Sequence, residues 1–246
     1  MKRSAAVAAL VVGSAFTTLL AADTVRILAP VHAQQVPGAF GSIWSTELRV
    51  FNSGDSTATL YPPCITGGPC PINEVPAGGD VEVVWLLGPD KGGPKFFDVD
   101  SSELAQLTFQ LRVFDESRTM LNWGTIVPVV EWEKARGERF WFVRVPASPP
   151  FRHTLRIYSA TSPHPPTARV RYYNADTSEL VAERTLLVGM WYKELHSSSI
   201  LELEDVSSVR IEVVSETGDD IWAMVSVTND DTQVVTILPG EHRTGD

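Results

Sequence analysis

Hydrophobic and polar residues alternate with a period of two along much of the chain. From Leu107 to Phe114, apolar residues are separated by threonine, glutamine and arginine, and the segments around Ile211 and Val225 repeat this pattern. Such alternation is typical of strands that bury one face. A sustained helical stripe over about eleven residues is not found anywhere in the sequence. The pattern therefore predicts an all-β protein.

Clusters of glycine, proline, asparagine and aspartate separate these segments at short intervals. They read NSGD, PAGGD, GPDKGGP, SPHPP, NADTS, ETGDD and TNDD. Short alternating strands with turn residues at this spacing are typical of β-sandwiches and barrels.

One order of residues occurs twice. STELRVFNSGDSTATLY and RHTLRIYSATSPHPPTARVRYY both place leucine, arginine, an aliphatic residue and an aromatic residue before a polar turn. Their leucines, Leu48 and Leu155, are roughly 100 residues apart, which is the size of one sandwich domain. The charged stretch EWEKARGER falls between the copies. We therefore expect two tandem antiparallel β-sandwich domains, immunoglobulin-like, over residues 34–131 and 140–246, joined by a linker at 132–139.

The first 33 residues resemble a secretory signal peptide. Lys2 and Arg3 precede an uncharged apolar run that ends near Ala22. The favoured cleavage site follows Ala33, and a cut near Ala21 or Ala22 is the alternative. An uncleaved anchor is a further interpretation, although glycine, serine and threonine make this run a weak one. We expect a secreted or periplasmic protein whose mature chain has no membrane span.

Two short motifs of the first unit carry a resemblance to a known group. The segment LRVFNSGDSTATL, followed later by INEVPAGGDVEVVWL, resembles bacterial immunoglobulin-like adhesion and surface domains of the CARDB type. The likeness covers about forty residues, and the second unit has SATSPHPP where the Asn-x-Gly-Asp turn would stand. The resemblance implies an extracellular, non-catalytic sandwich and assigns no functional residues.

Charge and cysteine content narrow the classes of partner. The formal net charge is −10 at pH 7, which argues against nucleic acid because a nucleic-acid-binding face is basic. Cys64 and Cys70 lie in the glycine- and proline-rich loop PPCITGGPCP. In an oxidising compartment this pair favours a small disulfide, and the loop has no further cysteine or histidine for a zinc site.

Motifs of catalysis and metal binding are not found. The sequence has no G-x-S-x-G and no H-E-x-x-H, and GPDKGGPK has proline where a phosphate loop requires lysine. The acidic turns at 219–220 and 229–231 lie at opposite ends of one predicted hairpin, so they favour ordinary turns over calcium. We expect no catalytic residues, no metal and no cofactor. An enzyme whose carboxylates meet only in the fold remains an alternative.

Aromatic and arginine side chains of the second unit are the candidate ligand site. By strand parity they lie on a face opposite the core, where aromatic rings could stack on sugars and arginine could donate hydrogen bonds. Cover by the neighbouring domain, by a loop or by another subunit is the competing explanation. The candidate residues are Arg156, Tyr158, Arg171, Tyr173 and Trp222.

These observations lead to one main functional hypothesis and one alternative. The first is a non-catalytic structural or interaction protein that binds a protein or a cell-surface polysaccharide. The alternative is a carbohydrate-binding module that uses the aromatic and arginine face of the second domain. The oligomeric state stays open.

Overall fold

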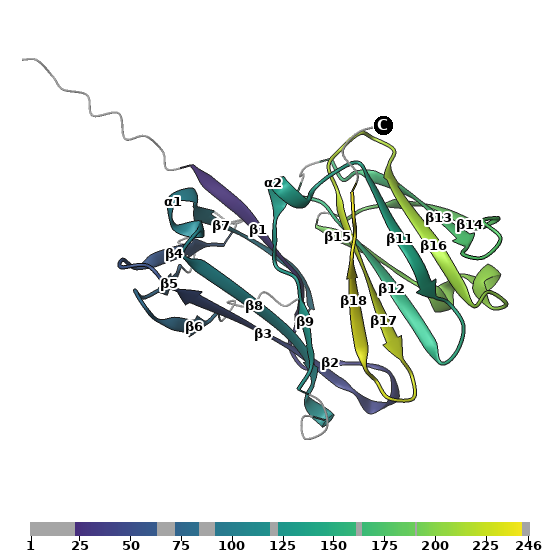
Figure 1. Ribbon diagram of the computed structural model, residues 1–246, viewed down its shortest axis with the longest axis horizontal. Coiled ribbons are helices and arrows are strands. Elements are labelled where there is room, and N and C mark those ends of the chain that lie inside the picture. Colours follow the sequence, from purple (N-terminus) through teal and green to yellow (C-terminus); the bar gives the residue numbers. More distant parts are fainter. Residues whose placement is uncertain are drawn as a thin grey trace, which may run out of the picture.

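The computed structural model describes residues 23–62, 72–83, 92–118, 123–160, 164–189 and 191–242. Within these ranges the chain forms four antiparallel sheets and a few helices of one turn (Figure 1). The predicted all-β class is confirmed. Cys64 and Cys70 lie outside the described residues, so their disulfide stays a prediction.

Residues 24–131 form two of the sheets. The β1 sheet has the order β10-β1-β7-β4-β5, and the β3 sheet has the order β2-β3-β8-β9, with β6 also paired to β3. Their strands are β1 (Thr24–Ala33), β2 (Val36–Pro37), β3 (Ile43–Asn52), β4 (Ala58–Tyr61), β5 (Asn73–Val75), β6 (Asp80–Glu82), β7 (Gly92–Asp100), β8 (Leu107–Asp115), β9 (Thr125–Val127) and β10 (Val130–Glu131). The short helices are η1 (Ala39–Gly41), α1 (Ser101–Leu104), η2 (Glu116–Arg118) and α2 (Trp132–Ala135).

Residues 139–239 form the other two sheets. The β11 sheet has the order β11-β16-β13-β14, and the β12 sheet has the order β15-β12-β17-β18. Their strands are β11 (Arg139–Pro146), β12 (Phe151–Tyr158), β13 (Thr167–Asn174), β14 (Leu180–Leu187), β15 (Tyr192–His196), β16 (Ser208–Ser215), β17 (Trp222–Asn229) and β18 (Val235–Pro239). Two 3-10 turns, η3 (Ser197–Ser199) and η4 (Leu201–Leu203), follow β15.

In each half, the two sheets pack against each other through alternate side chains. Phe97 of the β1 sheet meets Phe109 of the β3 sheet with 5.7 Å between ring centroids. His153 of the β12 sheet meets Tyr172 of the β11 sheet at 6.0 Å. His153 is buried in this layer. Alternation places one face of each strand between the sheets, as expected for half-buried strands.

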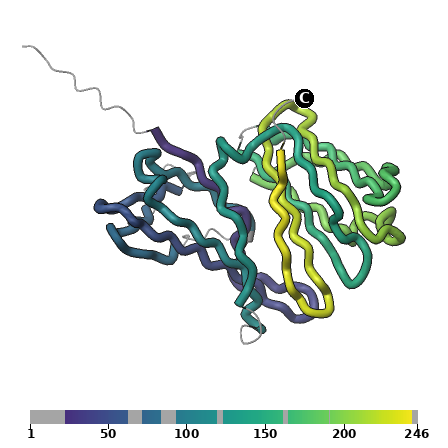
Figure 2. The backbone as a smooth tube through the Cα atoms, in the orientation of Figure 1, coloured from purple at the N-terminus to yellow at the C-terminus, as the bar shows by residue number. Residues whose placement is uncertain are grey.

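The two halves have corresponding strand orders. The run β1-β7-β4-β5 matches β11-β16-β13-β14, and β6-β3-β8-β9 matches β15-β12-β17-β18. The short strands β2 and β10 have no counterpart among the described strands of the second half. Leu48 of β3 and Leu155 of β12, the leucines of the sequence repeat, therefore lie on corresponding strands. Figure 2 shows the first half in purple to teal and the second in teal to yellow.

The strand order differs from that of an immunoglobulin domain. In that fold the first two strands are neighbours in one sheet. Here β11 and β12 lie in different sheets, and so do β1 and β3. The expected immunoglobulin-like topology is thus not confirmed for the described strands. Alternation shows which residues form strands and which face is buried, but it does not show which strands pair.

The strand β1 contains residues that the sequence assigns to the leader. It pairs with β7 on one side and with β10 on the other, and Ile27 and Leu28 are buried. In the structure the first half therefore includes residues from Thr24 on, which lie ahead of the predicted start at residue 34. An apolar strand of this kind is hard to distinguish by composition from the end of a leader. The alternative cut near Ala21 or Ala22 would leave the sheet intact.

The halves are joined by a continuous set of contacts, and α2 lies in the predicted linker. Phe96 of β7 packs on Trp132 of α2 and on Trp191 of the second half, with ring centroids 5.3 and 5.4 Å away. Thr125 Oγ1 donates a hydrogen bond to the carbonyl of Val235 at 2.7 Å. The buried apolar residues of both halves form one cluster.

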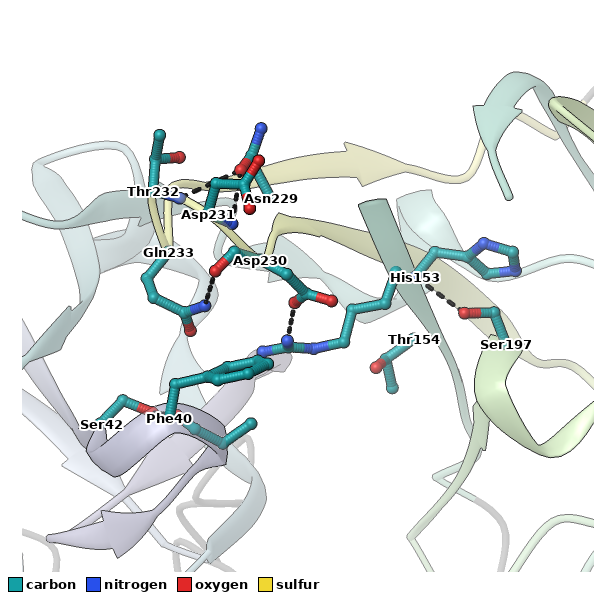
Figure 3. A network of polar contacts seen from close by, with 12 residues as sticks. Phe40, Ser42, His153, Thr154, Ser197, Asn229, Asp230, Asp231, Thr232 and Gln233 are labelled. Atoms are coloured by element: carbon teal, nitrogen blue, oxygen red, sulfur yellow. Dashed lines mark hydrogen bonds and ion pairs between the residues drawn. The ribbon is translucent and has the colours of Figure 1, made fainter. Parts of the chain in front are cut away.

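A second junction between the halves surrounds Arg152. Its guanidinium pairs with Asp230 and lies 5.9 Å from the ring centroid of Phe40, which belongs to η1 (Figure 3).

Among the described residues, no helix has the length and apolar character needed to cross a bilayer.

Candidate functional site

Three of the five candidate ligand residues do not lie on an exposed face. Tyr158 and Trp222 are 0% and 2% exposed, and Arg156 is bonded to Glu194 at 2.6 Å and to Ser226 at 2.8 Å. They share the face of the β12 sheet that parity assigns to them, opposite Leu155. The prediction that this face is open to a ligand is therefore wrong.

The first half of the chain covers this face. Tyr158 packs on Trp222 at 5.4 Å and on Tyr192 at 6.4 Å. A Cβ atom built on Gly93 of β7 would lie 3.2 Å from the Tyr192 ring, so the two halves are in close contact here. Burial raises the pKa of Tyr158 well above its ordinary value. The residues act in packing between the halves.

The remaining two candidates, Arg171 and Tyr173, lie on the outer face of the β11 sheet. Their neighbours Val170 and Tyr172 are buried, while Arg171 and Tyr173 are partly exposed. In the sheet register Arg171 is opposite both Glu183 and Glu212, and Tyr173 is opposite Arg210. The structure therefore separates the five predicted residues onto two sheets.

An aromatic pair with an arginine is the main feature of this outer face. The rings of Trp141 and Tyr173 are 6.5 Å apart at an angle of 33°. The guanidinium of Arg210 lies 4.6 Å from the Tyr173 centroid and 5.5 Å from that of Trp141. These are distances at which a cation is attracted to an aromatic ring. We call Trp141, Tyr173 and Arg210 the aromatic cluster.

Strand parity could have placed Trp141 and Arg210, which the sequence analysis did not identify, on the outer face of their strands. In RFWFV of β11, Phe140 and Phe142 are buried and Trp141 points the other way. In SVRIEV of β16, Val209 and Ile211 are buried and Arg210 points outward. Their neighbourhood with Tyr173 requires the order β11-β16-β13, which the sequence does not reveal.

A buried carboxylate holds the cluster and the adjacent arginines together. Glu212 accepts hydrogen bonds from Arg171 at 3.3 Å and from the Tyr173 hydroxyl at 3.2 Å, and it lies 3.7 Å from Arg139. Burial, and then the charge of Glu212, raise the pKa of Tyr173, so its hydroxyl stays protonated and donates. The hydrogen bond from Arg171 lowers the pKa of Glu183.

A groove runs beside the aromatic cluster. Its volume is about 1080 Å³, slightly above the usual range of ligand sites in proteins. It passes along β11 to the segment after β18, where Trp141 N donates to the Glu241 carbonyl at 3.3 Å. Its lining includes Arg139, Trp141, Arg210, Glu138, Glu241 and His242. Tyr173 flanks the groove through its contact with Trp141.

The acidic turns of the second half have structural partners. Asp220 pairs with Arg136, and Asp230 pairs with Arg152. Asn229 Oδ1 accepts from the backbone of Asp231 and Thr232 at 2.9 and 3.0 Å, which closes the turn (Figure 3). Within the described part of the chain, no group of three histidine, cysteine, aspartate or glutamate side chains could hold a metal ion.

Comparison with known proteins leaves the site to be interpreted from its own geometry. No protein-family model matches the chain, no curated protein matches it, and no solved structure matches it.

Proposed function

We propose that this chain is an exported, non-catalytic binding protein of two β-sandwich units in tandem, and that it binds a carbohydrate on the outer face of the β11 sheet. The observation that carries the proposal is the aromatic cluster at the edge of the groove, with Trp141 and Tyr173 at 6.5 Å.

The chemistry of the cluster suits a saccharide. One face of a pyranose ring carries C–H groups, which pack on aromatic rings, while its hydroxyls require hydrogen-bond partners at the periphery. Trp141 lines the groove with such a ring, and Arg139 and Arg210 supply donors beside it. Glu241 and Glu138 add acceptors along the same groove.

The aromatic cluster is held in place before a ligand arrives. Tyr173 is bonded to Glu212, Arg210 is stacked on two rings, and all three residues project from paired strands. Side chains fixed in this way lose little conformational freedom on binding, which favours affinity. Sites on strands are also held more firmly than sites on loops.

Three features of the sequence support export and a non-catalytic role. The basic and apolar N-terminus resembles a signal peptide, the spacing of Cys64 and Cys70 fits a disulfide, and the first unit resembles CARDB-type surface domains. In this proposal the leader ends before Thr24, so that β1 stays in the mature protein.

Binding to a panel of glycans and cell-wall polysaccharides tests the proposal. The protein would be exported with its own leader, purified, and compared with the variants Trp141→Ala and Tyr173→Ala. We expect each variant to bind about tenfold more weakly, because each removes a stacking surface. Thermal unfolding would show that the variants remain folded.

Trp123→Ala is the matched control. Trp123 is 59% exposed, and its ring lies 4.8 Å from the guanidinium of Arg112, so it is also an exposed tryptophan beside an arginine. It belongs to the first half, away from the groove, and its loss should leave glycan binding unchanged. If the unaltered protein bound no glycan, or if Trp123→Ala weakened binding as much as Trp141→Ala, the proposal would be overturned.

A further inference from the structure

Arginines outnumber carboxylates on the outer face of the β11 sheet. Among the described residues of its strands and their ion-pair partners, four arginines meet three glutamates, although the whole chain carries a net charge of −10. The arginines are Arg139, Arg169, Arg171 and Arg210, and the glutamates are Glu183, Glu212 and Glu216. Among these seven residues the arginines therefore exceed the glutamates by one.

Arg210 is the arginine without a carboxylate. Arg169 pairs with Glu216 at 2.7 Å and Arg171 with Glu183 at 2.6 Å, while Arg139 lies 3.7 Å from Glu212. Arg210 makes no ion pair within the described residues, and its buried Nε atom has no hydrogen-bond partner there. Its contacts are the rings of Tyr173 and Trp141.

A guanidinium that has no carboxylate partner is available to bind an anion. Guanidinium groups bind carboxylates through two parallel hydrogen bonds, which are stronger than bonds between neutral groups. The two rings restrict Arg210, so it loses little freedom when it binds such a group. Arg210 also lines the groove beside Trp141, so an anion at its guanidinium would be part of a ligand that stacks on that ring.

Acidic residues line the groove as well as arginines. β11 runs between β16, which carries Arg210, and the segment of Glu241, which is bridged to Trp141. Glu138 and Glu241 also line the groove, and Arg136 in the same groove is paired with Asp220. A ligand that is acidic throughout would meet repulsion there, whereas hydroxyl groups could donate to these carboxylates.

We propose that the ligand is a saccharide that contains a uronic acid, with its carboxylate on Arg210, a ring on Trp141 and hydroxyls toward Glu241. This inference rests on the proposed function and adds the chemical class of the sugar. A uronic acid joins one carboxylate to a ring with several hydroxyls, which is the combination that the two sides of the groove require. Arg210 then determines specificity.

Matched pairs of oligosaccharides test this inference. Titration calorimetry would compare neutral oligoglucose with oligoglucuronate of equal length, for the full exported protein and for Arg210→Gln and Arg210→Lys. We expect the unaltered protein to prefer the uronate at least tenfold. Arg210→Gln should abolish that preference, and Arg210→Lys should keep part of it, because lysine retains the charge and lacks the paired donors.

Arg169→Gln is the control for charge. It removes one positive charge from the same sheet face, but Arg169 is paired with Glu216. We expect its preference for the uronate to change less than twofold. If Arg169→Gln and Arg210→Gln reduced the preference equally, a general electrostatic effect would explain it and the assignment to Arg210 would be wrong.

The outcomes separate the two proposals. Binding of both oligosaccharides with equal affinity would overturn the inference and leave the carbohydrate-binding function standing. Binding of neither, and of no other glycan, would overturn the function as well. If poly-glutamate bound as tightly as the uronate with the same dependence on Arg210, the site would be one for acidic peptides and the saccharide class would be wrong.

Discussion

Trp222 packs on Tyr158 with ring centroids 5.4 Å apart, on a sheet face that strand parity alone would assign to solvent. Both side chains are buried, because the first half of the chain covers this face of the β12 sheet. The aromatic residues of the second half thus lie in different surroundings. Tyr158 and Trp222 of the β12 sheet are buried, whereas Trp141 and Tyr173 lie on the partly exposed outer face of the β11 sheet.

Replacement of Trp222 tests its role in packing. Trp222→Ala leaves a large cavity between the halves, and we expect it to lower the free energy of unfolding by about 3–5 kcal/mol. Trp123→Ala, at an exposed tryptophan, should cost less than about 1 kcal/mol. Urea unfolding followed by circular dichroism would measure both. Equal losses in the two variants would contradict the buried position of Trp222.

A second test concerns the residue at which the folded chain begins. β1 lies between β7 and β10, and removing it would expose both neighbours and take away buried residues such as Ile27 and Leu28, at about 1.5–3 kcal/mol for each large apolar side chain. We expect a chain that starts at Asp23 to unfold cooperatively and one that starts at Gln34 to be severely destabilised. Intact-mass measurement of the exported protein should place its N-terminus at or before Asp23. A folded exported protein that starts at Gln34 would contradict this.

We expect the coupling of the two halves to depend on Phe96. It is buried between Trp132 and Trp191, so Phe96→Ala removes contacts to both the linker helix and the second half. We expect the variant to lose about 3–5 kcal/mol and to unfold in two separated calorimetric transitions instead of one. Phe51→Ala, at a partly exposed phenylalanine of the first half, is the control and should retain one transition. A single transition in Phe96→Ala would show that other contacts suffice to couple the halves.

Stability should fall in mildly acidic solution because of His32. Burial, and then the charge of Lys95, lower its pKa from 6.5 to about 4. The unfolded chain therefore binds a proton near pH 6.5 that the folded chain does not accept until about pH 4, so stability is lost as the pH falls through this window. Burial lowers the pKa of His153 as well, which adds to the same slope.

The variant His32→Gln separates this contribution from the others. We expect it to reduce the loss of stability between pH 6.5 and 4.5, measured by urea unfolding at several pH values. His164→Gln, at an exposed histidine, serves as the control. An unchanged slope in His32→Gln would mean that His32 is accessible to protons in the folded protein.

The strands and their buried faces can be predicted from the sequence, but the pairing of the strands largely cannot. Alternation around Leu107, Ile211 and Val225 correctly predicts β8, β16 and β17, because side-chain period follows directly from strand geometry. The pairing of β11 with β16, and of β16 with β13, depends on contacts between residues far apart in the chain. The cluster of Trp141, Tyr173 and Arg210 therefore cannot be predicted from a local sequence pattern.

Solvent exposure of side chains is a second property that local sequence patterns do not predict. Parity correctly assigns Tyr158 and Trp222 to the face opposite Leu155, and it cannot show that the other half of the chain covers that face. Histidines are a similar case. His153 is buried against Tyr172, whereas His164 is exposed. Tryptophan and histidine occur both in cores and at surfaces, so residue type alone does not show whether a given side chain is buried.

The most direct test of the central claim is an NMR titration that observes the indole N–H signals of the seven tryptophans as a uronate oligosaccharide is added. We expect the Trp141 signal, assigned by its loss in Trp141→Ala, to shift in a saturable manner, while those of Trp222 and Trp123 stay in place. A shift at Trp123, or no shift at any tryptophan with this or any other glycan, would contradict the assignment of the outer face of the β11 sheet as the binding site.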